Sequence, residues 1–192
     1  MKNLIFASHN AHKVKEINQL LEGKYNVQSL AESGFTEEIE ETGSTLTENA
    51  LLKARCIYSK LHCDCFADDT GLEVDALGGR PGVYSARYAG EPKNDRNNIL
   101  LLLQELQGIK KRTARFKTVI ALIIEGKEYL FEGVVEGSIS EEVNGDNGFG
   151  YDPVFIPAGY DTTFAEMTAA QKNDISHRAI AVRKLADFLC SA

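Results

Sequence analysis

Short apolar runs alternate with amphipathic stretches along the first part of this chain. Residues 4–7 form an apolar run that is typical of a buried strand, and residues 25–30 are a second strand candidate. Apolar side chains between these two runs recur at helical spacing, at Val14, Ile17, Leu20 and Leu21. The chain is therefore expected to open as a strand, a polar loop and a helix.

A second helix is predicted to follow the acidic run at residues 37–41. That run is either a solvated face or a source of one carboxylate near a cation. Thr45 or Thr47 can cap the start of the helix, and Lys53 lies on its more polar side. The apolar face of the helix consists of Leu46, Ala50, Leu51, Ala54, Ile57, Tyr58 and Leu61.

The second half of the chain holds the clearest hairpin pattern. Residues 116–125 form a long apolar strand rich in β-branched residues, Gly126 turns it, and residues 129–137 return. Helices are expected at residues 95–106 and after Ser176. The predicted fold class is therefore α/β, with a mixed β-sheet flanked by helices.

Composition and charge narrow the classes of function. The 192 residues suit a single domain over residues 1–192. The net charge of −7 disfavours extended contact with nucleic acid, which needs a basic face. The apolar run in the first residues is too short for a signal peptide, and no stretch approaches the roughly 20 apolar residues of a membrane span. The four cysteines lack disulfide or zinc-finger spacing, so we expect reduced thiols and a cytoplasmic protein. From the charge and the lack of a long apolar stretch, we expect neither nucleic-acid nor membrane partners.

Two adjacent carboxylates, Asp68 and Asp69, are the centre of the candidate chemistry. They precede Thr70 and Gly71, so the pattern predicts a strand that ends in a tight turn with the acids at its end. Carboxylates suit Mg²⁺, which takes oxygen ligands, and general-base work on a water; ordinary turn chemistry explains the same residues. On an extended strand the two acids would point to opposite faces. Asp69 is favoured as the working acid because it lies nearer to the predicted break.

Two polar loops could receive ligands. Residues 8–13 join the first strand to the first helix, where backbone N–H groups and the helix dipole favour an anion and Lys13 adds a cation. The spacing of this loop is not that of a P-loop. In the glycine-rich loop at residues 145–153, Phe149 lies between glycines, which let a flat ligand approach closely. The basic pair 177–178 at a helix start indicates an acceptor-rich partner, although a nearby Asp explains it equally well.

Five motifs, taken in order, resemble one family. The chain reads S-H-N-A-H-K at 8–13, A-D-D-T-G-L at 67–72, G-G-R-P-G-V-Y-S-A-R at 78–87, F-G-Y-D-P-V-F at 149–155 and S-H-R at 176–178. These segments are similar to motifs of the noncanonical purine NTP pyrophosphatases, the inosine triphosphatase or Ham1-like group. The resemblance implies a two-lobed α/β fold with a long mixed β-sheet, a nucleotide cleft between the lobes, and a homodimer. It also implies Mg²⁺-dependent hydrolysis of ITP, dITP and XTP to the monophosphate and pyrophosphate.

The resemblance also implies roles for single residues. Asp69 matches the catalytic acid of the family, a proton acceptor and metal ligand, and Glu40 matches a metal-ligand glutamate. The role of Asp68 stays open between a second metal contact and turn support. Substrate contacts are expected at the matching positions, which are Ser8, His9, Asn10, Ala11, His12, Lys13, Lys53, Thr70, Phe149, Gly150, Tyr151, Asp152, Lys172, His177 and Arg178.

Base selection follows from hydrogen-bond donors and acceptors. Hypoxanthine and xanthine offer an O6 acceptor and an N1–H donor, so Asp152 would accept from N1–H and Arg178 would donate to O6. Phe149 would stack on the ring. Adenine would leave these protein groups unpaired, which rejects a wrong base strongly. The exclusion of guanine and the preference among ITP, dITP and XTP are left open.

Three residues depart from the family motifs. Ser8 replaces Thr, Thr70 replaces Ser, and His9 replaces Gly, which puts a side chain beside the expected phosphate site. A nucleotide-binding sensor without catalysis is therefore one competing hypothesis. A phosphatase with an aspartyl-phosphate intermediate is another, weakened because that chemistry favours acids two apart on one strand face.

Overall fold

The computed structural model describes residues 3–21 and 26–191, so residue 25 of the second predicted strand lies outside the described residues. The strands are β1 (Asn3–Phe6), β2 (Asn26–Ser29), β3 (Cys65–Val74), β4 (Pro81–Gly82), β5 (Thr113–Ile124), β6 (Lys127–Ile139) and β7 (Phe155–Pro157). The α-helices are α1 (Ala11–Leu21), α2 (Leu46–Leu61), α3 (Asp95–Glu105), α4 (Ala169–Ile175) and α5 (His177–Ser191).

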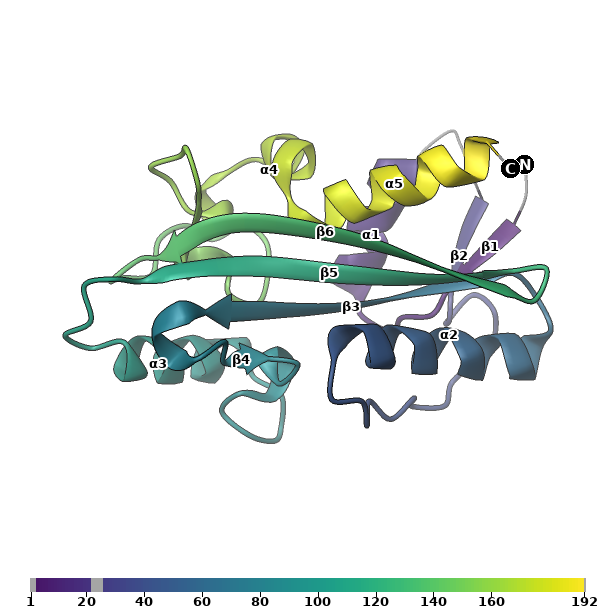
Figure 1. The fold of residues 1–192 in the computed structure, drawn as a ribbon, viewed down its shortest axis with the longest axis horizontal. Coiled ribbons are helices and arrows are strands. Elements are labelled where there is room, and N and C mark those ends of the chain that lie inside the picture. Colours follow the sequence, from purple (N-terminus) through teal and green to yellow (C-terminus); the bar gives the residue numbers. More distant parts are fainter. Residues whose placement is uncertain (1–2, 22–25, 192) are drawn as a thin grey trace. The chain divides into compact units, whose positions relative to one another are not determined.

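The strands form one mixed sheet. Its order is β2-β1-β3-β5-β6-β7, and β4 pairs with β3 outside this path. β1 is parallel to β2 and β3, whereas the β3–β4 and β6–β7 pairs are antiparallel. The register of Phe6 with Phe66 brings the residues that follow β1 beside Asp68 and Asp69 on β3. The predicted α/β class with a mixed sheet is confirmed (Figure 1).

The chain packs as two compact units. Unit 1 comprises residues 1–69, 118–133 and 178–192, and unit 2 comprises residues 70–117 and 134–177. Strands β3, β5 and β6 contribute residues to both units. The single domain expected from the sequence stays a prediction.

Each unit has its own apolar core. In unit 1, Phe6 of β1 stacks on Phe66 of β3 with ring centroids 4.9 Å apart. Apolar residues of α1, α5 and β5 pack around this pair, while α2 covers the other face of the unit 1 strands (Figure 1). In unit 2, Leu72 of β3 packs with Leu102 of α3 and Phe116 of β5. Adjacent residues of β3 in unit 1 therefore face different helices.

The turn predicted at Thr70 and Gly71 is wrong. β3 continues from Cys65 to Val74, so both acids lie in the middle of a strand. Beyond the predicted turn, β3 pairs with β4 at Leu72 and Glu73, and β5 is its other neighbour in the sheet. This pairing outweighs the local turn preference of the Asp, Thr and Gly side chains. The chain leaves the strand only after Val74 and turns at Gly78, whose φ is +64°.

Helix α2 begins as predicted but buries one unexpected residue. The Thr45 side chain accepts a hydrogen bond from the Glu48 N–H at 3.1 Å and so caps the helix. Lys53, expected on the more polar side, is only 8% exposed. The expectation for Lys53 is corrected because carboxylates from neighbouring segments surround its ammonium.

The predicted helices at residues 95–106 and after Ser176 are confirmed as α3 and α5, and the predicted hairpin is confirmed as β5 and β6. Helix α4 has no counterpart among the predicted elements. Its start carries a capping box in which Thr168 and Gln171 bond each other's backbone N–H. That box was a readable signal in the sequence.

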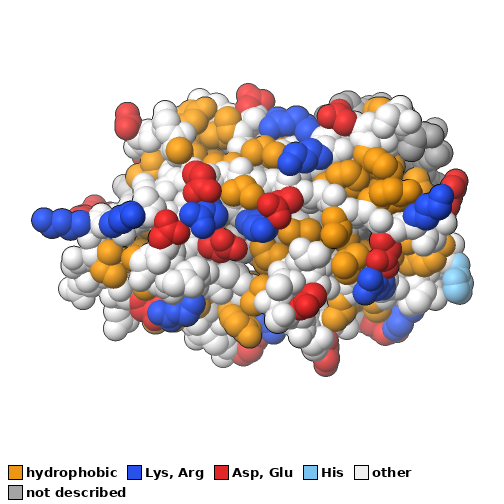
Figure 2. Space-filling view, viewed as in Figure 1, with side chains coloured by type: hydrophobic (Ala, Val, Ile, Leu, Met, Phe, Trp, Pro, Cys, Tyr) orange, Lys and Arg blue, Asp and Glu red, His pale blue; other side chains and the backbone are white. Residues whose placement is uncertain are grey.

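The surface carries both signs of charge. On the described part of the face in Figure 2, Lys and Arg side chains are interspersed with Asp and Glu and form no continuous basic stripe. Arg115, for example, lies 3.1 Å from Asp75 and 3.0 Å from Glu136. Within residues 3–21 and 26–191, no helix has the length and apolarity needed to cross a membrane. The expected absence of nucleic-acid and membrane partners stays a prediction.

Candidate active site

Asp69 lies on the α2 side of β3. The residue is 7% exposed, and its Oδ2 accepts a hydrogen bond from Asn49 Nδ2 at 3.1 Å. Its Oδ1 lies 3.4 Å from the Lys53 ammonium. Burial raises the pKa of Asp69, and the charges of Lys53 and Lys13 offset only part of that rise. The carboxylate is therefore held by an amide on one oxygen and by a cation on the other.

Lys53 joins Asp69 to the acidic segment before α2. Its Nζ lies 2.6 Å from Glu41 Oε1 and 3.4 Å from Asp69 Oδ1. Burial lowers the pKa of Lys53, but the charges of Asp69 and Glu41 outweigh burial and keep that pKa above its ordinary value. Glu40, the predicted metal ligand, is exposed, whereas Glu41 is half-buried. The structure thus brings Glu41, rather than Glu40, to the ammonium that also contacts Asp69.

Asp68 faces the opposite side of β3, so the prediction that the two acids point to opposite faces is confirmed. Lys13 Nζ lies 2.9 Å from Asp68 Oδ1, and Arg178 Nε lies 3.3 Å from Asp68 Oδ2. Burial raises the pKa of Asp68, but the charges of Lys13 and Arg178 outweigh burial and hold that pKa well below its usual range. Arg178 also pairs with Glu16 of α1. Asp68 is therefore an ionised group that ties β3 to α1 and α5.

The loop at residues 8–13 is organised by its own side chains. Asn10 Oδ1 accepts hydrogen bonds from the His12 N–H at 3.0 Å and the Lys13 N–H at 3.2 Å, which caps α1. The Asn10 N–H in turn donates to Ser8 Oγ at 3.2 Å. In the predicted anion loop, the Ser8 and Asn10 side chains therefore accept hydrogen bonds from backbone N–H groups at the start of α1.

The His9 ring packs onto a neighbouring segment. Its Nε2 lies 3.0 Å from the Glu37 carbonyl oxygen, and its ring centroid lies 6.4 Å from that of Phe35. Lys60 covers the same Phe35 ring at 5.4 Å. The side chain that departs from the family motif thus has a packing partner within unit 1.

The glycine-rich loop of unit 2 closes around Asp152. Asp152 Oδ2 accepts from the Phe149 N–H at 2.9 Å and lies 2.7 Å from Lys172 Nζ. The Lys172 ammonium also lies 5.1 Å from the Phe149 ring centroid. A Cβ at Gly148 would come within 2.0 Å of Asp152 Oδ2. Phe149, Asp152 and Lys172 therefore form one cluster.

Anchors from other elements hold the same loop. The Tyr151 hydroxyl donates to the Ser85 carbonyl at 2.8 Å, and the Gly150 N–H donates to Asp95 Oδ2 at 2.8 Å. Burial raises the pKa of Tyr151 far above its usual range, so the hydroxyl stays protonated. Tyr151 therefore anchors the loop to the segment after β4, and Gly150 anchors it to α3.

The remaining predicted contacts are spread over both units. Ala11 and His12 are exposed at the start of α1, and Thr70 is half-buried on β3. His177 is 3% exposed, and its ring stacks on Phe116 with centroids 4.5 Å apart. His177 is therefore part of the unit 2 core in this structure.

Comparison with known proteins identifies the family. The model of the Ham1 family matches residues 4–188, nearly the whole chain. The chain belongs to the Ham1 family.

Relatives and solved structures agree with this assignment. A dITP/XTP pyrophosphatase of Bacillus subtilis is 55% identical over 193 residues, and the match covers 98% of this chain and 98% of that protein. One of Christiangramia forsetii is 53% identical over 186 residues, 97% of this chain and 98% of its own. The Ham1 protein of Coxiella burnetii superposes with a TM-score of 0.91 at 38% identity over 100% of both chains. The Staphylococcus aureus Ham1 protein gives 0.89 at 41% identity over 99% of both. The protein therefore has the Ham1 fold.

The residues around Asp69 fit the Mg²⁺ that the Ham1 resemblance implies. One oxygen of Asp69 and one of Glu41 already converge on a single cation, the Lys53 ammonium. Mg²⁺ in nucleotide sites is commonly bound by one or two carboxylates, with phosphates and waters completing its shell. Among the described residues, no group of three or more His, Cys, Asp and Glu could hold a metal. A metal at Asp69 would therefore need oxygens from the substrate and from water.

Sequence reasoning missed several residues of this Ham1-family site. Glu41 was part of the acidic run but was not singled out. Glu16 and Asp95 could not be recognised, because acids in a helix are usually exposed to solvent. Asn49 did give one, because it falls on the apolar face of α2 beside Ala50. A buried amide on an apolar face needs polar partners, so its position could have indicated a contact with another element.

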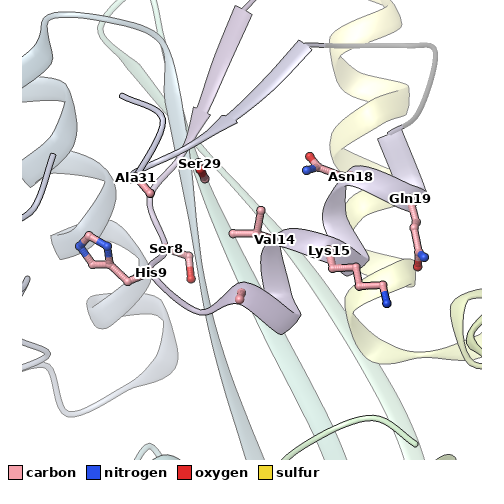
Figure 3. A pocket seen from close by; sticks show the side chains of 9 residues that line it. Ser8, His9, Val14, Lys15, Asn18, Gln19, Ser29 and Ala31 are labelled. Atoms are coloured by element: carbon pink, nitrogen blue, oxygen red, sulfur yellow. The ribbon is translucent and has the colours of Figure 1, made fainter. Parts of the chain in front are cut away.

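A cavity of about 650 Å³ borders the predicted phosphate loop of this Ham1-family chain (Figure 3). Ser8 and His9 lie on one side of it, and Asn18 and Gln19 lie on the other. The full lining is Ser8, His9, Ala11, Val14, Lys15, Asn18, Gln19, Ser29 and Ala31. The acids of β3 do not line this cavity, so it is distinct from the Asp69 cluster.

Proposed function

We propose that this protein is a dITP/XTP pyrophosphatase, a nucleotide hydrolase that also accepts ITP and releases the monophosphate and pyrophosphate. Its role would be to remove such nucleotides from the pool. Full-length relatives at 53% and 55% identity carry the name dITP/XTP pyrophosphatase. The structural observation that carries the proposal is the convergence of Asp69 and Glu41 on one cation beside the loop at residues 8–13. That arrangement suits a site for a metal and phosphates.

The triphosphate would be received by local cations. The protein carries a net charge of −7, so a polyanion needs a basic site of its own. Lys13 and Lys53 supply one, and each is paired with a buried aspartate. Substrate phosphates would compete for these ammonium groups, which couples phosphate binding to exposure of the Asp69 carboxylate.

Mg²⁺ would be held by Asp69 together with Glu41 or Glu40 and by substrate oxygens. When bound, the ion neutralises the charge that develops as the α–β phosphoanhydride breaks. A carboxylate that holds a metal directly is a weak base, so Asp69 would orient the attacking water rather than carry its proton alone. Because Asn49 donates to Asp69 Oδ2, Asp69 Oδ1 is the oxygen that faces the Lys53 ammonium.

The purine base would be read by the cluster around Asp152. Phe149 would stack on the ring, and Asp152 would accept from N1–H as the sequence predicts. Lys172 lies beside both residues and would be a second candidate donor to O6. Arg178, the donor expected from the sequence, has its guanidinium in ion pairs with Asp68 and Glu16. Its contact with O6 stays a prediction that requires it to leave these acids.

Three broader features belong to the same proposal. The nucleotide cleft between two lobes, the homodimer and the cytoplasmic location are implied by the resemblance. Light scattering on the purified protein tests the dimer, which should have twice the mass of one chain. A monomer at micromolar concentration would contradict that part of the proposal.

A rate panel with product identification tests the activity. Purified protein is incubated with Mg²⁺ and dITP, ITP, XTP, GTP or ATP, and the products are separated. The expected products from ITP are IMP and pyrophosphate, with GTP and ATP hydrolysed far more slowly. IDP with free phosphate would instead support the aspartyl-phosphate alternative, and binding without turnover would support the sensor.

A further inference from the structure

Asn49 is a buried amide with a polar partner at each end. The residue is 2% exposed and lies in α2 among buried apolar residues. Its Nδ2 donates to Asp69 Oδ2 at 3.1 Å, and its Oδ1 accepts from the Gly43 N–H at 2.8 Å. Because the amide is planar, these two bonds together fix the orientation of its side chain.

These two bonds join the acidic segment to the acid on β3. Gly43 follows Glu41 closely in the chain, so its N–H bond to Asn49 anchors the end of the segment that carries Glu41. A Cβ at Gly43 would come within 2.6 Å of Asn49 Oδ1, which shows how closely backbone and amide approach. The bond to Asp69 Oδ2 leaves Oδ1 directed at the Lys53 ammonium, where Glu41 also points.

We propose that Asn49 is a positioning residue that sets the Asp69 carboxylate and the Glu41 segment for metal binding. This inference rests on the proposed function and adds a residue to its site. Hydrogen-bond partners that orient a metal-ligating carboxylate typically contribute roughly 10- to 100-fold in metal affinity or activity when removed. Asn49 acts through Asp69 and does not itself touch substrate.

The first test is Asn49→Ala in the full-length protein, with Mn²⁺ as the metal probe. Free Mn²⁺ is titrated by electron paramagnetic resonance, a readout that does not depend on turnover. Mn²⁺ affinity is expected to fall roughly 10- to 100-fold, and the Mg²⁺ concentration for half-maximal dITP hydrolysis is expected to rise in parallel. The KM for dITP at saturating Mg²⁺ is expected to change little.

Asn98→Ala is the matched control. Asn98 is also 2% exposed, and it bonds backbone groups at Ala89 and Ala86 at 2.7 and 3.1 Å. Its loss and the loss of Asn49 are both expected to lower the melting temperature, but loss of Asn98 should leave Mn²⁺ affinity unchanged. An equal loss of Mn²⁺ affinity in both variants would mean that general destabilisation explains the effect, and would overturn the proposal.

A second variant covers the case in which Asn49→Ala does not fold. Asn49→Asp keeps the acceptor for the Gly43 N–H and removes the donor to Asp69. The kcat at saturating Mg²⁺ is expected to fall at least about tenfold. A wild-type kcat in Asn49→Asp, or wild-type Mn²⁺ affinity in Asn49→Ala, would overturn the positioning role.

Failure of the proposed function would be visible separately. Wild-type protein that releases no pyrophosphate from dITP would reject the function, whereas the Mn²⁺ titration would still report whether Asn49 supports metal binding. In an Asp69→Asn background, the Asn49→Ala change should weaken Mn²⁺ binding by less than it does in the wild type, because only the bond that anchors the Glu41 segment is then lost. A loss as large as in the wild type would show that Asn49 does not act through Asp69.

Discussion

Asp68 and Asp69 are neighbours in the chain, yet their carboxylates have different partners. Asp68 is held by Lys13 and Arg178, and Asp69 is held by Asn49 and Lys53. The alternation of side chains along β3 accounts for this separation. At the residue scale, the two acids therefore contact different groups on opposite faces of β3.

Asp69→Asn is expected to abolish turnover while largely preserving ITP binding. The amide keeps the size of the side chain but removes the charge needed to bind metal and orient water. The expected loss in kcat is at least about 100-fold, measured by pyrophosphate release. The binding of ITP is measured by calorimetry on the same preparation. Retained turnover would remove Asp69 from the mechanism.

Asp68→Asn is expected to reduce stability instead. Asp68 is 1% exposed, and loss of its charge would remove a carboxylate partner from both Lys13 and Arg178, of which Arg178 keeps its pair with Glu16. Loss of one partner in a buried ion pair costs about 3–5 kcal/mol. Urea unfolding of the wild type and the variant measures the difference. A change well under 1 kcal/mol would show that water replaces the carboxylate at this position.

At the scale of elements, the loop at residues 145–153 is shaped by close backbone contact rather than by apolar burial. Asp152 Oδ2 receives both the Phe149 N–H and the Lys172 ammonium. Gly148 has a φ of +77° and leaves no room for a Cβ beside that oxygen. The loop therefore depends on this glycine for its shape.

Gly148→Ala is expected to raise the KM for dITP by up to about 100-fold, because a displacement of about 1 Å in a binding group can cost that much. Gly150→Ala is the matched control. Gly150 also has a positive φ, +60°, but its Cβ would meet nothing within 4 Å. Both variants bear the backbone strain, and only Gly148→Ala collides with Asp152. Equal effects on KM would attribute the loss to strain alone.

At the scale of the whole molecule, the apolar cores are separate from the proposed chemistry. The cores of both units consist of apolar residues. The carboxylates converge instead on cationic side chains. Stability and metal-dependent activity are therefore expected to be separable.

Chelation tests this separation. Removal of divalent metal with EDTA is expected to lower pyrophosphate release by at least about 100-fold, since a Lewis-acid metal contributes several kcal/mol to such a step. Added Mg²⁺ should restore the rate. The circular dichroism spectrum and melting temperature are expected to change little. Unfolding on chelation would show that the metal also has a structural role.

Local patterns were sufficient for most elements. Helical spacing placed α1, α2, α3 and α5, and the Thr45 cap and the β5–β6 hairpin were readable because their signals lie within a few residues. The five motifs identify the family from the sequence alone, and the match of the Ham1 family model to residues 4–188 confirms it. The opposite directions of Asp68 and Asp69 also followed from the sequence, through strand geometry alone.

The sequence by itself thus determined the fold class, the family and the acids to examine, because these depend on local periodicity and on motifs. Tertiary structure decided the rest. Sheet pairing continued strand β3 through Thr70 and Gly71, where local preference predicted a turn. Packing of α2 on β3 buried Lys53 and brought Asn49 and Glu41 to Asp69. These partners come from segments far apart in the chain, so only the fold could bring them together.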